Sequence, residues 1–191
     1  DVRGIVGRDL TPDFAEALGR AWATLAWKRF DRAPVLAVGR DNRPSGPELA
    51  AAVRRGIAAS GGTAIDVGEL PTPALYFAVH ALEVDGGLQV TGSHNPPEFN
   101  GFKMVLGGEA LHGDAIQSLR DLMERDAFRS GAGAERMDAT ILRRYREAII
   151  ERHRLDRPVR VVVACANGVA SLVAVCVLEA QPKIISTVAI M

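Results

Sequence analysis

The sequence predicts an α/β fold in which helices cover the faces of a central sheet. Helix and strand patterns alternate along most of the 191 residues, and this alternation is typical of layered α/β/α sandwiches. The composition is 48% hydrophobic and 24% charged, as in ordinary globular proteins, which excludes disorder for most of the chain. The length allows one large domain, or one domain and part of another.

Two helix starts can be placed on particular residues. Thr11 is a suitable N-cap, and Pro12 follows in the first turn, where its missing N–H costs nothing. Ser45 and Glu48 have the spacing of a capping box, in which each side chain satisfies an exposed backbone amide. We expect the second helix to end at the glycine pair 61–62.

Apolar runs and their glycine or proline breaks define the other elements. Strands are predicted at 34–39, 63–67, 87–91, 101–106 and 159–165, and helices at 74–82, 112–125 and 138–154. Residues 131–133 predict a linker, and Asp138 is expected to cap the helix that begins there. The core face of that last helix is expected to be Ile141, Leu142, Tyr145 and Ile149.

A domain boundary is predicted near residue 156, which divides the chain into 1–156 and 157–191. The second part holds one predicted strand and one predicted helix, too little to bury its own apolar faces. It therefore either completes the first sheet or opens a second domain. If it folds within this chain alone, we expect an apolar surface beyond residue 158.

Charge and cysteine content exclude several classes of protein. The 23 basic residues balance 23 acidic ones, which argues against general nucleic-acid binding. Cys165 and Cys176 have no earlier partner, so a secreted disulfide scaffold is excluded and a reducing, cytoplasmic location is expected. The charged start predicts no signal peptide.

The uncharged run 161–178 raises the alternative of a membrane anchor. Asn167, Gly168 and Ser171 interrupt it, which favours a buried strand followed by a helix. We therefore expect no membrane association.

Polar groups concentrate between the predicted strands 87–91 and 101–106. This segment carries the hydroxyl of Ser93, the imidazole of His94, the amides of Asn95 and Asn100, and the ammonium of Lys103. It leaves the end of a predicted buried strand, where α/β sheets tend to bind ligands. Composition alone would equally fit an ordinary surface loop.

The order of these residues closely resembles the active-site serine loop of the α-D-phosphohexomutase superfamily, in particular its bacterial phosphomannomutase/phosphoglucomutase branch. The motif is Thr-Gly-Ser-His-Asn-Pro-Pro at 91–97 followed by Asn-Gly-Phe-Lys at 100–103. Segments 1–4, 39–46, 71–73 and 161–168 resemble further family motifs in the family's order. The resemblance implies a phosphoglucomutase-like first domain with a mixed sheet over 1–156, and the incomplete start of a second domain over 157–191.

The resemblance also implies an activity, the movement of a phosphoryl group between the 1- and 6-positions of a hexose phosphate. Ser93 would carry the group as phosphoserine, with a bisphosphate as intermediate and hexose 1,6-bisphosphate as activator. Lys103 would move the proton between the serine oxygen and the sugar hydroxyl. His94 would orient the phosphoserine or the substrate, and Arg3 would bind phosphate through its planar fork.

The remaining site residues have supporting roles in this prediction. Asn95 and Asn100 would contact substrate or phosphate, while Arg40, Asp41 and Arg43 would support the loop through ion pairs. Lys103, Arg3 and His94 each have a plain alternative, as a solvated lysine at a strand end, a mobile terminal arginine and a histidine that only fixes the loop.

The resemblance further implies Mg²⁺ at the phosphoserine, but the family's Asp-Gly-Asp-Gly-Asp-Arg metal loop is absent from this sequence. The phosphate on Ser93 would be the single evident ligand. We therefore expect the parent protein to be a mutase and the isolated chain to be inactive without the family's C-terminal domains or a complementary chain. The alternative is a shortened, non-catalytic protein that binds a sugar phosphate or a partner.

Overall fold

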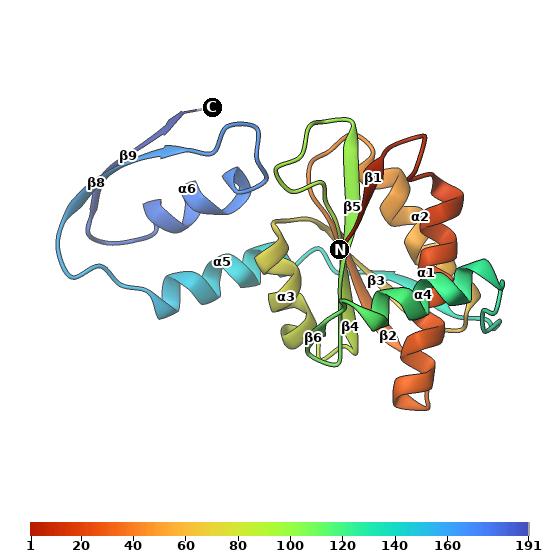
Figure 1. Cartoon of the computed structure of the whole chain (residues 1–191). Coiled ribbons are helices and arrows are strands. Elements are labelled where there is room, and N and C mark those ends of the chain that lie inside the picture. The colour runs from red at the N-terminus through yellow and green to blue at the C-terminus, as the bar shows by residue number, and fades with distance from the viewer. Residues whose placement is uncertain (191) are drawn as a thin grey trace.

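A mixed seven-stranded sheet lies at the centre of the computed structural model, which describes residues 1–190, and helices pack on both of its faces (Figure 1). The predicted α/β/α sandwich with a mixed sheet is therefore confirmed. The strands in spatial order are β1 (Val2–Ile5), β5 (Phe99–Leu106), β4 (Gly86–Val90), β2 (Val35–Arg40), β3 (Thr63–Glu69) and β7 (Ala134–Met137), with β6 (Glu109–Ala110) paired to β5.

Strand directions place several carboxyl ends at one sheet edge. β4, β2, β3 and β7 run parallel to one another, and β5 pairs antiparallel with both β4 and β1. The loops that leave β2, β3 and β4 therefore emerge from the sheet on the same side. In open α/β sheets this is the side on which ligands bind.

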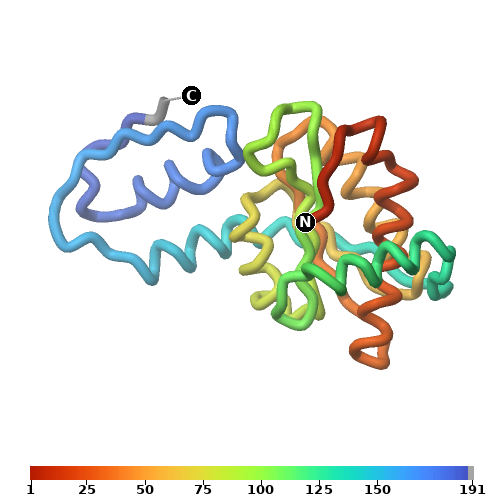
Figure 2. The backbone as a smooth tube through the Cα atoms, in the orientation of Figure 1, coloured from red at the N-terminus to blue at the C-terminus, as the bar shows by residue number. Residues whose placement is uncertain are grey.

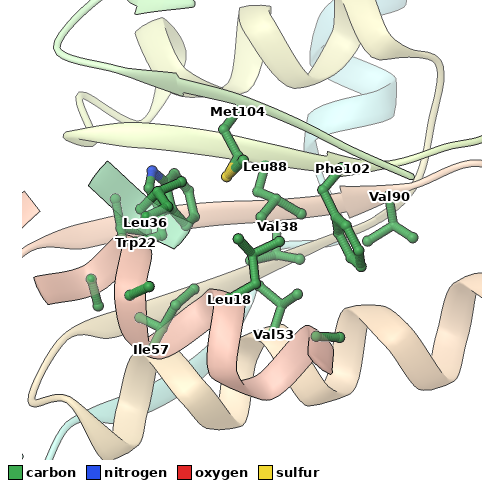
Figure 3. Close-up of a cluster of buried hydrophobic side chains, with 14 of the residues drawn as sticks. Leu18, Trp22, Leu36, Val38, Val53, Ile57, Leu88, Val90, Phe102 and Met104 are labelled. Atoms are coloured by element: carbon green, nitrogen blue, oxygen red, sulfur yellow. The ribbon is translucent and has the colours of Figure 1, made fainter. Parts of the chain in front are cut away.

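Two hydrophobic cores cover the two sheet faces. The larger core packs α1 (Pro12–Phe30), α2 (Gly46–Ala59) and α4 (Asp114–Glu124) against one face. The smaller core packs α3 (Thr72–Ala81) and α5 (Ile141–Arg152) against the other. Side chains alternate along the buried strands, so that Leu36 and Val38 enter the larger core and Ala37 the smaller. Figure 3 shows residues of α1, α2, β2, β4 and β5 meeting in the larger core.

The two predicted helix caps have different outcomes. Thr11 Oγ1 accepts a hydrogen bond from the amide of Phe14 at 3.2 Å, which confirms the first cap. The capping box at Ser45 is wrong, because Ser45 already has helical backbone angles and makes no side-chain cap bond within the described residues. Its hydroxyl instead accepts from Nδ2 of Asn100 at 2.8 Å. A tertiary contact has replaced the local one.

The predicted linker at 131–133 holds no helix or strand of its own, but it packs closely against the end of α2. Gly131 forms an isolated bridge with Ser60, and Ala134 begins β7, an edge strand parallel to β3 that the sequence did not predict. A Cβ on Gly133 would lie 2.0 Å from the carbonyl oxygen of Gly62, so the backbones approach too closely for a side chain. β7 is exposed along its length, and its sequence therefore lacks the hydrophobic alternation that predicts a strand.

Asp138 begins the turn before α5 rather than capping the helix directly. Its Oδ1 accepts from the amide and the hydroxyl of Thr140 at 2.7 and 2.6 Å. The hydrogen bond from the Thr140 hydroxyl lowers the pKa of the Asp138 carboxyl below its ordinary value. Ile141 is buried, and Leu142 and Tyr145 pack against the smaller core, as predicted for this helix.

Residues 157–190 form a small unit of their own. β8 (Val159–Ala164) and β9 (Ile184–Ile190) pair in parallel in a separate sheet, with α6 (Ser171–Glu179) between them in sequence. The unit therefore does not extend the seven-stranded sheet, and β9 was missed by the sequence analysis. Figure 2 shows the chain leaving α5, forming β8, and returning so that the start of α6 lies near the first unit.

The small unit bears on two expectations, the apolar surface beyond residue 158 and the membrane-anchor alternative for residues 161–178. Val162, Ile185 and Val188 are exposed, as expected for an apolar surface beyond residue 158. The uncharged run 161–178 is divided between β8, a turn and α6. Among the described helices, none combines the length and apolar character that a membrane crossing needs.

Candidate active site

A cavity of about 590 Å³ lies at the carboxyl ends of β2, β3 and β4. Its walls come from the loop after β2, the start of α3, the segment after β4 and the turn before α6. The lining residues are 41–44, 71–73, 91, 93–95, 97 and 167–170. The predicted serine loop therefore borders a cavity. The walls of this cavity come both from residues 1–156 and from residues 157–190.

Ser93 lies exposed at this cavity with an unusual backbone conformation. Its φ of 55° falls in the left-handed region, which residues other than glycine rarely occupy and which often marks functional sites. Its hydroxyl oxygen is 3.3 Å from Nδ1 of His94. The arrangement presents a primary hydroxyl beside an imidazole at the cavity.

A buried carboxylate holds this conformation through Thr91. Asp41 is only 6% exposed, and its Oδ2 accepts from the hydroxyl of Thr91 at 2.6 Å. The same hydroxyl oxygen accepts from the amide of Ser93 at 2.9 Å. Because the threonine hydroxyl donates its hydrogen to the carboxylate, the lone pairs of its oxygen are free to accept from the serine amide. Thr91 was not among the predicted site residues, although its place two residues before Ser93 is the spacing of a threonine turn.

Arg43 fixes the rest of the serine loop. Its Nη1 donates to the carbonyl oxygens of Pro96 and Phe99 at 2.7 and 2.9 Å. Its Nη2 donates to those of Ser93 and Asn95 at 3.0 and 2.7 Å. The five donors of a guanidinium suit this convergence of carbonyl groups.

Among the three residues predicted to support the loop through ion pairs, Arg43 pairs with Asp41, with its Nε 3.3 Å from Oδ2 of the carboxylate. The carbonyl contacts of Arg43 could not be predicted, since backbone oxygens carry no sequence signal. Gly92 leaves room for the Arg43 side chain, because a Cβ at residue 92 would lie 2.3 Å from the guanidinium carbon. A further ion pair, between Nη1 of Arg40 and Oε2 of Glu69 at 2.6 Å, joins the ends of β2 and β3.

Asn100 was predicted to contact a ligand, but it does not line the cavity. It is fully buried, with its Nδ2 bound to Ser45 and its Oδ1 accepting from the amide of Gly101 at 2.9 Å. Both ends of its amide are therefore used inside the protein, where they join β5 to the start of α2. Asn95 does line the cavity.

Arg3 and Lys103 lie together on the neighbouring strands β1 and β5. Oδ2 of Asp1 is 3.0 Å from Nη2 of Arg3 and 3.7 Å from Nζ of Lys103. A Cβ on Gly101 would touch both Cγ of Arg3 at 3.1 Å and the carbonyl oxygen of Thr91 at 3.2 Å, so Arg3 lies beside the start of the serine loop. Both cations are partly exposed, and within residues 1–190 neither belongs to the cavity wall itself.

The described residues do not fit a magnesium site. No three His, Cys, Asp or Glu side chains within residues 1–190 come together in a group that could hold a metal ion. Magnesium prefers several oxygen ligands, including one or two carboxylates beside phosphate oxygens. The carboxylate of Asp41, near the serine, is already bound to Thr91 and Arg43. No chemical step is therefore assigned to a metal.

The turn before α6 contributes residues that were not predicted for the site. Nδ2 of Asn42 donates to the carbonyl oxygen of Asn167 at 2.6 Å, and both residues line the cavity. No signal in the sequence links residues 42 and 167, because they are far apart and neither belongs to the serine motif.

Comparisons with known proteins agree on one family. Residues 1–130 match the family described as phosphoglucomutase/phosphomannomutase, alpha/beta/alpha domain I. A phosphomannomutase/phosphoglucomutase of Pseudomonas aeruginosa is 44% identical over 181 residues, covering 94% of this chain and 38% of its own length. A phosphoglucomutase of Neisseria gonorrhoeae is 42% identical over 173 residues, covering 88% of this chain and 36% of its own.

A solved structure gives the same result. A phosphoglucomutase/phosphomannomutase family protein from Burkholderia thailandensis matches all of this chain with a TM-score of 0.90 and 38% identity. The match covers 42% of the Burkholderia chain. The present chain thus spans well under half the length of each of these proteins.

Proposed function

The chain belongs to the phosphoglucomutase/phosphomannomutase family, and on that premise we propose that it carries the phosphoryl-transferring serine of a phosphohexomutase. The proposed reaction moves a phosphoryl group between the 1- and 6-positions of a hexose phosphate through phosphoserine at Ser93 and a hexose 1,6-bisphosphate. We propose residues 1–156 as the first domain of this enzyme and 157–191 as the start of its second.

One observation carries the proposal: Ser93 is held in a left-handed conformation, with its hydroxyl exposed at a cavity. The hydrogen bonds of Thr91, Asp41 and Arg43 all act on this one position. A loop that only reverses the chain has no need of a strained serine fixed by a buried carboxylate and an arginine. Phosphoryl transfer does, because it depends mainly on positioning and charge stabilisation.

The neighbouring cations suit the charge of a phosphoserine. A phosphate ester adds about −1.5 to −2 charges at neutral pH, which requires positive partners. Within the described cavity wall, Arg43 is the one arginine or lysine, and it is already paired with Asp41. Arg3 and Lys103 share only the carboxylate of Asp1, which a phosphate group would replace. Arg3 would then bind phosphate, and Lys103 would exchange a proton with the serine or sugar oxygen.

The other predicted residues take roles that their positions support. His94 would orient the serine oxygen or its phosphate, because its Nδ1 already lies 3.3 Å away. Asn95 would contact substrate at the cavity wall. We reassign Asn100 from ligand contact to loop support, beside Arg40, Asp41 and Arg43, because it is buried.

The test is phosphorylation by glucose 1,6-bisphosphate and Mg²⁺ of the chain together with the family's C-terminal domains, read by intact and peptide mass. We expect the wild-type protein to gain one phosphate, located on Ser93. Ser93→Ala should gain none, whereas Ser118→Ala, which alters an exposed hydroxyl on α4, should behave as wild type. Equal incorporation in wild type and Ser93→Ala would rule out Ser93 as the carrier.

A second outcome would favour the non-catalytic alternative. A ligand that binds only the folded state raises its stability. If glucose 1-phosphate raises the unfolding temperature of wild type and Ser93→Ala equally, with no phosphate on Ser93, the chain is a sugar-phosphate-binding protein.

A further inference from the structure

We propose that Asn167 is a deamidation site, and that its conversion to a carboxylate adds a negative charge to the wall of the Ser93 cavity. The chain contains two Asn-Gly pairs, Asn100–Gly101 and Asn167–Gly168. Asn167 and Gly168 are exposed, whereas Asn100 and Gly101 are buried. We therefore expect the first pair to react and the second to be inert in the folded chain.

The reaction needs only water. The backbone nitrogen of Gly168 attacks Cγ of Asn167, and the new N–Cγ bond closes a five-membered succinimide. The side-chain nitrogen leaves as ammonia and takes up the proton from the Gly168 amide. Water then opens one of the two imide carbonyls and gives aspartate or isoaspartate. Glycine favours the attack because it has no Cβ to obstruct it and because its backbone rotates freely.

The surroundings of Asn167 permit this closure. Asn167 and Gly168 are both exposed, in the turn between β8 and α6, next to Ala166 with its left-handed φ of 45°. The Asn167 side chain makes no hydrogen bond within the described residues. Gly168 itself has no side chain to obstruct the closure, and a Cβ there would lie 3.0 Å from the carbonyl oxygen of Cys165, which is a tight contact.

Two exposed bonds restrain the turn. The amide of Gly168 donates to the carbonyl oxygen of Cys165 at 3.0 Å, and Nδ2 of Asn42 donates to that of Asn167 at 2.6 Å. Opening them is a local event of the kind that costs little free energy. The Asn42 contact should therefore slow the reaction without preventing it.

Asn100 is an internal control of the same sequence. Its side chain is fully buried, and both ends of its amide are bound, to Ser45 and to the amide of Gly101. Gly101 is paired in β5 opposite Arg3. The attack on Asn100 thus requires unfolding of the central sheet, whereas that on Asn167 requires only a turn to open.

The product alters the proposed substrate site. Residue 167 lines the same cavity as Ser93, so a carboxylate there adds a negative charge to the wall of the cavity that a phosphate group would enter. Like charges repel, and because the site is exposed, salt screens this repulsion. This consequence rests on the proposed function, whereas the modification itself does not.

The experiment incubates the chain at mildly alkaline pH and follows both sites by peptide mass. In the folded chain, we expect Asn167 to deamidate at least about a hundredfold faster than Asn100, because the latter waits for global unfolding. In denaturant, the two rates should become similar. Similar rates in the folded chain, or an unmodified Asn167 where the denatured chain is modified, would overturn the proposal.

Two variants test the geometry. Gly168→Ala should slow the reaction at least about tenfold by obstructing the attack. Asn42→Ala should accelerate it by removing one restraint. Modification of Gly168→Ala at the wild-type rate would exclude the succinimide route.

The charge effect is measured separately with Asn167→Asp. We expect weaker binding of glucose 1-phosphate than in wild type, with a difference that shrinks as salt is added. Equal binding would overturn the charge effect. Absence of binding to the wild-type chain would contradict the proposed function and leave the mass result intact.

Discussion

Ser93 depends on three residues that line the same cavity. Thr91 accepts from the Ser93 amide and donates to the buried carboxylate of Asp41, and Arg43 donates to the Ser93 carbonyl oxygen. These bonds hold the exposed serine in position. Such support would hold a nucleophile in one position. The serine motif in the sequence predicts which residue reacts, but not which residues hold it in place.

Thr91→Val tests this support at the scale of one residue. Valine keeps the shape of threonine but loses the bonds to Asp41 and to the Ser93 amide. We expect the Ser93 amide to lose protection from hydrogen exchange and the chain to lose about 1–3 kcal/mol of unfolding free energy, since a buried acceptor loses a partner. Thr91→Ser should restore both quantities. Unchanged protection of Ser93 in the valine variant would show that Arg43 alone holds the loop.

Asp9 gives a second residue-scale prediction, this time of pH dependence. Hydrogen bonds from Arg8 and from the amide of Ile5 lower the pKa of Asp9 from 3.8 to about 2. Because the folded pKa lies below the unfolded one, the ionised carboxylate stabilises the turn after β1 above pH 3.8, and this stabilisation is lost as pH falls towards about 2. An NMR titration of the Asp9 carboxyl measures the shift directly, and Asp9→Asn should remove this part of the acid dependence. A titration at the ordinary pKa would refute it.

At the scale of elements, the sequence predicted those strands and helices that have their own hydrophobic pattern. β2 and β4 were placed nearly correctly because buried strands form apolar runs, and α1 begins at Pro12 as its N-cap predicted. β7 was missed because an exposed edge strand needs no such pattern. The cap at Ser45 failed because Asn100, distant in sequence, takes its hydroxyl. Local rules predicted local contacts and missed those made across the fold.

The packing of α1 against α2 yields a prediction for an element pair. A Cβ on Gly56 of α2 would lie 2.1 Å from the carbonyl oxygen of Glu16 and 2.9 Å from the amide nitrogen of Arg20, both in α1. Alanine gains about 1 kcal/mol of helix propensity, but the clash with rigid backbone forces the helices apart. We expect Gly56→Ala to lower the unfolding free energy by at least about 2 kcal/mol. Denaturant unfolding measures the change, and a neutral or stabilised variant would mean that the helices separate at little cost.

At the scale of the whole molecule, the sequence predicted a division near residue 156 but missed the second strand of the smaller unit. Residues 157–190 form a strand–helix–strand unit with few buried side chains, Val173 and Gln181 among them. Its links to the first unit include the Asn42–Asn167 contact and a bond from the Arg146 guanidinium to the carbonyl oxygen of Leu172. The proposed site lies where these two units meet, so cavity shape depends on their contact as much as on the serine motif.

Truncation after residue 156 tests how the two parts depend on each other. The seven-stranded sheet and both of its cores lie within residues 1–156. Truncation there removes the contact between α6 and α5 but no residue of either core. We expect the truncated chain to unfold cooperatively, with a free energy within about 2 kcal/mol of the full chain, because few buried groups are lost. Residues 157–191 alone should stay unfolded by circular dichroism, since so short a segment buries too little apolar surface. Loss of cooperative unfolding in the 1–156 chain would instead show that the small unit completes the first core, and the boundary near residue 156 would have to be abandoned.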